Sequence, residues 1–221
     1  MQEAKRGSAP DGRRERWVEH RRERREEFVA GALEAVRKHG VETGLDEVAA
    51  SVGVSKSVVY RHFADRDDLF GAVLDSIADV VLMPRILGEL AQTASAPPDQ
   101  RVTDPATIRR IVRAFIAVVD EEPQLYRFAL AHTSAGTGGD FVATTERQVA
   151  QALAAVIGDR MRELGLDSGG AEVWAFGVVG MVQLATQRWF DHRTMTADAL
   201  ADYLTALVTG GLTGVLAAPG R

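Results

Sequence analysis

Apolar residues recur along the chain at the spacing of one helix face, and no segment alternates apolar and polar residues as a half-buried strand does. The first helical pattern begins at about Trp17 and ends near His39, where Gly40 follows as a stop signal. Its apolar positions are Phe28, Val29, Ala32, Leu33 and Val36. The pattern predicts an all-α protein.

Two short helical segments follow, joined by a tight turn at Gly53. The apolar side of the first comprises Leu45, Val48, Ala49 and Val52. The apolar side of the second comprises Val54, Val58, Val59 and Phe63. Ser55 is the predicted N-cap of this second helix, because its hydroxyl can accept from an amide two or three residues on. Helices of about eight residues are not stable alone, so both must pack on the first helix.

The remaining pattern predicts a larger set of helices. Aspartates after Ala64 open a fourth helix at the positive end of its dipole, and Pro84 is predicted to stop it. A polar linker precedes a helix that Asp104 caps and Pro105 begins, which runs to a break at Pro123. Further helices are predicted at 124–132, 141–164, 171–190 and 196–216.

These elements divide the chain into three parts. Residues 1–15 carry glycine and proline among charged residues without apolar periodicity, which predicts a disordered basic arm. Residues 16–66 form the three-helix unit, and residues 67–221 form a larger helical domain.

The net charge of −5 is unevenly distributed over the 221 residues. Residues 1–70 hold 14 Lys/Arg and 14 Asp/Glu, whereas residues 71–221 hold 12 and 17. The run from Val48 to Ala64 has no acidic residue, and its charges are Lys56 and Arg61, with His62 beside them. A surface that avoids acids indicates a negatively charged partner.

Composition excludes several classes of protein. The absence of cysteine removes disulfides, thiolate nucleophiles and cysteine metal sites, and suits a reducing cytoplasm. There is no signal peptide pattern, and the longest apolar run, Val173 to Leu184, is too short to span a membrane. We find no metal-ligand spacing of histidines, no phosphate-binding loop and no nucleophile elbow, and Asp191 with His192 has no nucleophile nearby. We therefore expect a cytoplasmic protein that is not an enzyme and holds no metal or cofactor.

The segment from Ser55 to Phe63 has the residues that a helix in the DNA major groove needs. Val59 and Phe63 can anchor it inward. The residues left toward solvent are Lys56, Ser57, Tyr60 and Arg61.

Five side chains of this segment have candidate DNA contacts. Lys56 can donate to guanine, Ser57 can reach a base edge or a phosphate, and Val58 can contact a thymine methyl. Tyr60 and His62 are placed for phosphate oxygens. A lone tyrosine or histidine is more often a packing or surface residue, but together on a helix without acids they favour DNA binding.

The stretch "EVAASVGVSKSVVYRHFADRDDLFGAVL" resembles the DNA-binding segment of TetR family transcriptional regulators, and the resemblance covers residues 28–74. The residues that fill the family pattern are Val48, Ala49, Gly53, Val54, Ser55, Tyr60, His62, Phe63 and Leu69. The resemblance implies that residues 16–66 form a helix-turn-helix domain. Its third helix would enter the major groove, with Lys56, Ser57 and Tyr60 approaching the bases.

Two positions depart from the family pattern. Arg66 stands where the pattern usually has lysine, and it keeps a charge for a phosphate contact. Gly44 stands where a threonine often touches the DNA backbone, and Thr43, one position away, is the candidate replacement.

The resemblance also implies that residues 67–221 bind an effector and dimerise through the last two helices. The protein would then be a repressor that binds a palindromic double-stranded operator as a homodimer and is released by a small hydrophobic effector. Large apolar side chains that could line an effector cavity are Phe115, Phe128, Phe141, Trp174, Phe176, Met181 and Trp189. Among these we single out Phe115, Phe128, Trp174, Met181 and Trp189, although core packing is the commoner role of any one of them.

Small residues in the last two helices favour close helix approach, since an interior glycine costs a helix about 1 kcal/mol relative to alanine. They are Gly177, Gly180, Ala185, Gly210, Gly211 and Gly214. A dimer interface would offset that cost, whereas the alternative is that the glycines only loosen helix ends. A second alternative for the whole chain is a helical protein that binds a small molecule or a protein partner without reading DNA.

Overall fold

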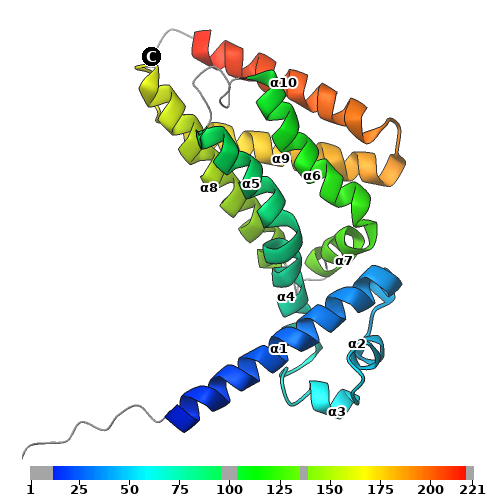
Figure 1. Ribbon diagram of the computed structural model, residues 1–221. Helices are drawn as coiled ribbons and strands as arrows, with labels where there is room; N and C mark the ends of the chain where they lie inside the picture. Colours follow the sequence, from blue (N-terminus) through cyan, green and yellow to red (C-terminus); the bar gives the residue numbers. More distant parts are fainter. Residues whose placement is uncertain (1–11, 96–103, 135–138, 218–221) are drawn as a thin grey trace, which may run out of the picture.

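The computed structural model describes residues 12–95, 104–134 and 139–217, and within these ranges every regular element is a helix (Figure 1). This confirms the all-α prediction. Residues 1–11 of the predicted basic arm lie outside the described residues. The first helix begins at Gly12, earlier than the apolar pattern predicted, so residues 12–15 are helical.

The N-terminal unit consists of one long helix with two short ones packed beneath it (Figure 1). Its elements are α1 (Gly12–His39), η1 (Gly40–Glu42), α2 (Leu45–Ser51) and α3 (Lys56–Val59). Gly53, between α2 and α3, has φ of 68°, a left-handed conformation that glycine adopts without strain. This turn sets α3 across α2, as the helix-turn-helix prediction requires.

Helix α3 is shorter than predicted. Only Lys56–Val59 is α-helical, and the chain continues to Phe63 in tighter turns in which Arg61 N donates to Val58 O at 3.2 Å and His62 N to Val59 O at 2.9 Å. Phe63 N still donates to Val59 O at 3.1 Å. The backbone therefore keeps turning as a helix up to Phe63, and its last turn is tightened toward 3₁₀ geometry.

The prediction that Pro84 ends the fourth helix is wrong. The α4 helix (Arg66–Ser76) continues without interruption into a π-helical stretch, η2 (Ile77–Leu82), and then into α5 (Met83–Ser95), which contains Pro84. A proline ring clashes with the carbonyl four residues earlier and lacks an amide donor. The wider π turns just before Pro84 accommodate both defects, because their hydrogen bonds do not use the α-helical register.

The remaining helices build the larger part of the molecule. They are α6 (Pro105–Glu121), α7 (Pro123–Ser134), α8 (Gly139–Glu163), α9 (Ala171–His192) and α10 (Ala197–Ala217). Asp104 caps α6 as predicted, since its carboxylate accepts from the amides of Ala106 and Thr107. In Figure 1, α5 and α8 lie alongside each other, while α9 and α10 form the end farthest from α3.

One hydrophobic core joins the N-terminal unit to the helices above it. Phe28, Val48 and Val59, from the three helices of the unit, are fully buried. The same core includes residues of α4, η2, α6 and α7, among them Leu69, Phe70, Ile77, Val81, Val118, Leu125, Phe128 and Ala129. The N-terminal unit is therefore packed continuously against α4 and α7.

Candidate nucleic-acid interface

The outward face of α3 displays the polar side chains that the sequence predicted there. Lys56, Ser57, Tyr60 and Arg61 are all exposed, and half of the Tyr60 surface is accessible (50%). Ser55 occupies the N-cap position, but its hydroxyl makes no capping bond and instead lies 2.9 Å from the hydroxyl of Ser57. Both serine hydroxyls thus remain on the surface.

Lys56 is held by an acid from the neighbouring helix. Its ammonium lies 2.8 Å from Asp46 Oδ2 of α2, and both side chains are exposed. The hydrogen bond to Asp46 raises the pKa of Lys56, so the lysine stays charged. The sequence analysis identified Lys56 but not its partner, because Asp46 lies outside the acid-free run from Val48 to Ala64.

Two predicted contact residues point partly inward. Val58 is half-buried and packs against the core. The His62 ring lies 5.0 Å from the Phe28 ring, and its Nδ1 is buried without a hydrogen-bond partner. The structure therefore places His62 at the contact with α1 and Val58 against the core, so neither lies fully on the outward face.

Arg25 of α1, which the sequence did not single out, braces the end of the α3 segment. Its guanidinium donates to the carbonyl of His62 at 2.7 Å and to Asp68 Oδ1 at 2.6 Å, and lies 4.1 Å from the centre of the Phe63 ring. Asp68, in the first turn of α4, also accepts from the amide of Ala64 at 2.9 Å. One side chain thus ties together α1, the end of α3 and the start of α4.

Positive charge gathers around this brace. Burial lowers the pKa of His62, and the charges of Arg21, Arg24, Arg25 and Arg61 lower it further. These arginines lie on the N-terminal half of α1 and at the end of the α3 segment. Basic residues of the N-terminal part are therefore brought next to the end of the α3 segment, where Arg24 and Arg25 also pair with Glu27 and Asp68.

The candidate substitute contact at Thr43 is wrong. Thr43 is fully buried, and its hydroxyl donates to Gly40 O at 2.7 Å and lies 3.3 Å from Ala35 O. It closes the turn between α1 and α2 and cannot reach a DNA backbone. Arg66, by contrast, is exposed at the start of α4, with its guanidinium 4.7 Å from the centre of the Phe70 ring.

A cavity of about 140 Å³ lies among η2, α5, α6, α7, α8 and α9. Most of its wall is aliphatic, and the polar side chains at its edge are Glu122, Tyr126, Thr145, Glu146 and Gln183. Of the predicted effector-contacting residues, Phe115 lines the cavity.

The other predicted cavity residues lie elsewhere. Phe128 belongs to the core shared with the N-terminal unit, while Met181 and Trp189 pack among α6, α9 and α10. Trp174 packs in the cores on either side of α9, and Phe176 is exposed. Nothing is described of the side chain of Phe141. Phe128, Met181, Trp174 and Trp189 thus belong to packed cores, and the cavity wall is mainly aliphatic apart from Phe115 and Tyr126.

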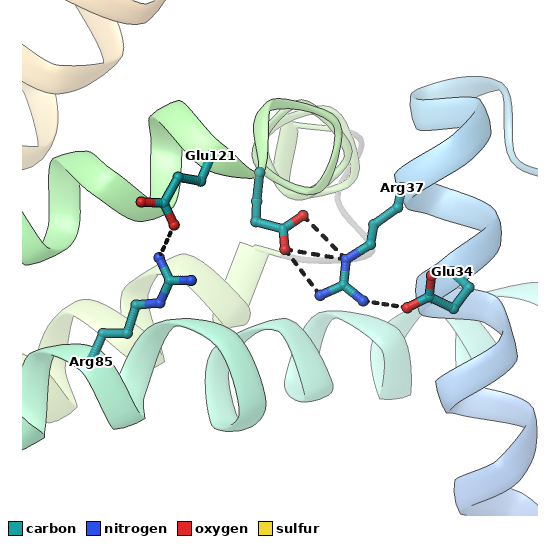
Figure 2. Close-up of polar contacts among 5 residues, drawn as sticks. Glu34, Arg37, Arg85 and Glu121 are labelled. Carbon is teal, nitrogen blue, oxygen red and sulfur yellow. Dashed lines mark hydrogen bonds and ion pairs between the residues drawn. The ribbon is translucent and has the colours of Figure 1, made fainter.

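Glu122, between α6 and α7, lines this cavity and pairs with Arg37 of α1. Figure 2 shows the ion pairs at this junction. Arg37 Nε of α1 donates to both carboxylate oxygens of Glu122, at 3.2 and 3.1 Å, and Arg37 also pairs with Glu34. One residue earlier, Glu121 accepts from Arg85 of α5 at 2.7 Å. The two ion pairs hold the end of α6 from opposite sides.

An apolar surface runs along α9 and α10. Its exposed side chains are Val173, Phe176, Leu184, Tyr203 and Leu207. Gly177, Gly180, Gly210 and Gly211 are exposed on the same two helices. Nothing lies within 4 Å of a Cβ built on Gly177, Gly180 or Gly210. These three glycines therefore do not serve close packing within one chain, whereas a Cβ on Gly211 would lie 3.7 Å from Trp174.

Two absences apply to the described part of the chain. No group of three or more histidine, cysteine, aspartate or glutamate side chains there is placed to hold a metal ion. None of the helices described is both long and apolar enough to cross a membrane.

Family models match nearly the whole chain beyond the first helix turns. The model described as "Bacterial regulatory proteins, tetR family" matches residues 28–73. The model described as "Tetracyclin repressor-like, C-terminal domain" matches residues 89–220.

Curated relatives include an HTH-type transcriptional regulator of Mycobacterium tuberculosis strain H37Rv, which is 41% identical over 210 residues, covering 95% of this chain and 86% of the relative. The HTH-type transcriptional activator FasR of Mycolicibacterium smegmatis is 28% identical, covering 88% and 85% of the two chains. Among solved structures, a TetR-family regulator of Streptomyces coelicolor shares the fold, with a TM-score of 0.64 at 21% identity, covering 88% of this chain and 82% of the other.

Proposed function

Because this chain belongs to the TetR family of bacterial transcriptional regulators, we propose that it binds a palindromic operator as a homodimer and acts as a repressor. We further propose that a small apolar effector, bound in the cavity, releases it from DNA. DNA binding through a helix-turn-helix is a property of the family. What we propose for this chain is a palindromic operator, an apolar effector and repression.

The outward face of α3 is the observation that carries the proposal. Lys56, Ser57, Tyr60 and Arg61 are exposed together on a segment without acids, and Val59 and Phe63 anchor it from behind. A short, rigidly held helix with such residues is what major-groove reading requires.

Each outward residue has a proposed role. Lys56 donates to guanine O6 or N7 after leaving Asp46, and Ser57 meets a base edge. The hydroxyl of Tyr60 and the guanidinium groups of Arg61 and Arg66 meet phosphates, which position the domain and release counterions. The arginines near His62 extend the basic surface along α1.

The exposed apolar face of α9 and α10 supports the homodimer. Val173 and Leu184 expose 77% and 70% of their surfaces, and such large apolar residues rarely cluster on a free surface. A second copy of this face would cover them, and the exposed glycines would let the helices approach closely. A two-fold dimer reads two related half-sites, which is why a palindromic operator is proposed.

The cavity supports an apolar effector. Its wall includes Ile77, Val81 and Leu125, which also belong to the core that holds the N-terminal unit. A ligand can shift the population of DNA-binding conformers only through differential contacts with them, and this shared wall offers such contacts.

The test begins with selection of bound duplexes from a random pool by the wild-type protein. The double variant Lys56→Ala/Tyr60→Ala should then lose binding to the selected duplex by 100-fold or more, roughly 1–3 kcal/mol from each contact, while it still dimerises. Lys38→Ala, which removes an exposed lysine at the far end of α1, is the control and should bind normally. Failure of the wild-type protein to enrich any duplex would favour the alternative of a binding protein that does not read DNA.

The direction of regulation is tested separately. Transcription in vitro from a promoter that contains the selected duplex should fall when the protein is added. A rise in transcription would indicate an activator instead, which is what the relative FasR is named as.

A further inference from the structure

The α6–α7 junction is the place where the cavity wall and the N-terminal unit meet through polar contacts. Glu122 stands between the two helices, since α6 ends at Glu121 and α7 begins at Pro123. Its backbone has φ of −120° and ψ of 54°, outside helical values, so the direction of its side chain depends on how α6 and α7 are set relative to each other. Glu122 also lines the cavity.

The carboxylate of Glu122 is gripped by two nitrogens of Arg37. Arg37 Nη2 lies 3.1 Å from Oε1, and Nε lies 3.1 and 3.2 Å from the two oxygens (Figure 2). The two side chains expose 33% and 23% of their surfaces, so water screens the pair less than a fully exposed one. Hydrogen bonding to Glu122 is the main cause that raises the pKa of Arg37. A planar fork of this kind is sensitive to small shifts of either partner.

A second contact at the junction leads toward α2. Gly40 in η1 has φ of 62°, and a Cβ at this position would overlap Oε1 of Gln124 in the first turn of α7. The start of α7 therefore rests directly on the turn that precedes Thr43 and α2. A shift of α7 can be transmitted to the helix-turn-helix directly through this contact, without a shift of α4.

The apolar wall of the cavity completes the connection. Residues that both line the cavity and belong to the core of the N-terminal unit are Ile77, Val81, Val118, Leu125 and Ala129. Three of them lie on α6 or α7, on either side of the junction. An occupant that moves this wall moves Glu122 with it.

We propose that Arg37 and Glu122 are positioning residues that couple occupancy of the cavity to the orientation of the DNA-binding helices. The proposal rests on the proposed effector-regulated function, which it deepens. With the cavity empty, the fork fixes the end of α1 to the junction in the arrangement that binds DNA. With the cavity filled, the junction shifts, the fork loses its two-nitrogen geometry, and α1 to α3 are released from that arrangement.

The absence of cysteine makes a test with a tethered occupant possible. Val149→Cys in α8 places a thiol at the cavity wall, and reaction with decyl methanethiosulfonate fills the cavity with an alkyl chain. Ala143→Cys, exposed on the same helix, carries the same chain outside the cavity. The readout is the ratio of Kd values, labelled over unlabelled, for a duplex enriched from random sequence by the wild-type protein.

The alkyl chain attached at Val149→Cys should raise the Kd for the duplex by about five-fold or more, the lower end of ordinary allosteric coupling. The alkyl chain attached at Ala143→Cys should change this Kd by less than about two-fold. Adding Arg37→Gln or Glu122→Gln should collapse the Val149→Cys ratio to below about two. The matched control is Arg85→Gln, which breaks the neighbouring ion pair with Glu121 and should keep the full ratio. Arg37→Lys retains the charge without the fork, so its ratio should fall in between.

Three results would overturn the coupling role. A full ratio in Arg37→Gln, equal to that in Arg85→Gln, would show that the fork does not contribute to the coupling, while the effector-regulated function survived. An equal collapse in Arg85→Gln would show that the coupling is not specific to the fork. If the tethered alkyl chain does not change the Kd in Val149→Cys without further substitutions, both the proposed effector regulation and the coupling role are contradicted. Thermal unfolding of each variant, followed by circular dichroism, shows whether it is folded. Arg37→Lys retains a charged partner for Glu122 and is the milder variant if Arg37→Gln does not fold.

Discussion

The ammonium of Lys56 lies 2.8 Å from the carboxylate of Asp46, so the first cation of the proposed recognition helix is paired with an acid from the helix before it. In water an exposed pair of this kind contributes little to stability, because solvent screens it. In the proposed complex with DNA the same acid would face phosphates, and Lys56 would leave it to donate to a base. We therefore expect Asp46 to restrain DNA binding while it holds Lys56 in place.

Asp46→Asn should raise affinity for duplex DNA of any sequence, by roughly two- to ten-fold at low salt, because it removes a repulsive charge and frees Lys56. Fluorescence anisotropy titrations over a range of salt concentrations measure the change. Asp159→Asn, which removes an exposed and paired aspartate from α8, is the control and should have no effect. Weaker binding by Asp46→Asn would mean that the ion pair orients Lys56 in the complex.

The brace between Arg25 and Asp68 predicts a pH dependence of stability. Hydrogen bonding to Arg25 lowers the pKa of Asp68, so its stabilisation is present above the unfolded-state pKa of about 3.9 and is lost as pH falls through the lower folded value. Asp68→Asn should therefore cost about 1 kcal/mol near pH 7, and the difference from wild type should shrink below about pH 4. Urea unfolding at several pH values measures this difference. A difference that is constant down to pH 3 would contradict the assigned cause.

Thr43→Ala should destabilise the protein by about 1–2 kcal/mol, because it leaves buried carbonyl groups without the hydroxyl donor. The salt dependence of DNA binding should not change, since the side chain is buried and reaches no phosphate. Thr43→Ser, which keeps the hydroxyl, should be closer to wild type. A reduced salt slope in Thr43→Ala would restore a DNA contact at this position.

Leu184→Glu should dissociate the proposed dimer, because a carboxylate would be buried in the apolar face of α9. We expect the dimer Kd to rise by about 100-fold, corresponding to about 3 kcal/mol. Sedimentation equilibrium measures the shift. Val80→Glu, at an equally exposed apolar residue of η2 (66%), should leave the dimer intact. Dissociation by Val80→Glu instead would place the interface at η2 and not at the apolar face of α9.

Local sequence signals were sufficient where neighbouring residues decide the structure. The stop at Gly40, the turn at Gly53 and the cap at Asp104 act on residues within a few positions, and the structure has all three. The exposure of Lys56 and Tyr60 follows in the same way from helix spacing and from the anchors Val59 and Phe63. Their contacts with DNA remain predictions.

Local signals failed where a distant partner or a change of helix type intervened. Pro84 ended the predicted helix, but the π-helical turns before it let the helix continue. Thr43 was the candidate DNA-backbone contact beside Gly44, but tertiary packing buries it completely. The phosphate contact of His62 remains a prediction.

The all-α class, most helix positions and the outward face of α3 were determined by the sequence alone, because apolar spacing, caps and turns act over a few residues. The continuation of α4 through π-helical turns into α5 was not. Only the tertiary structure decided which apolar residues pack and which surround a cavity, since that depends on how several helices fit together. It likewise decided that Arg37 meets Glu122, 85 positions away along the chain. A charge pattern carries no information about such a partner until packing brings the two side chains together.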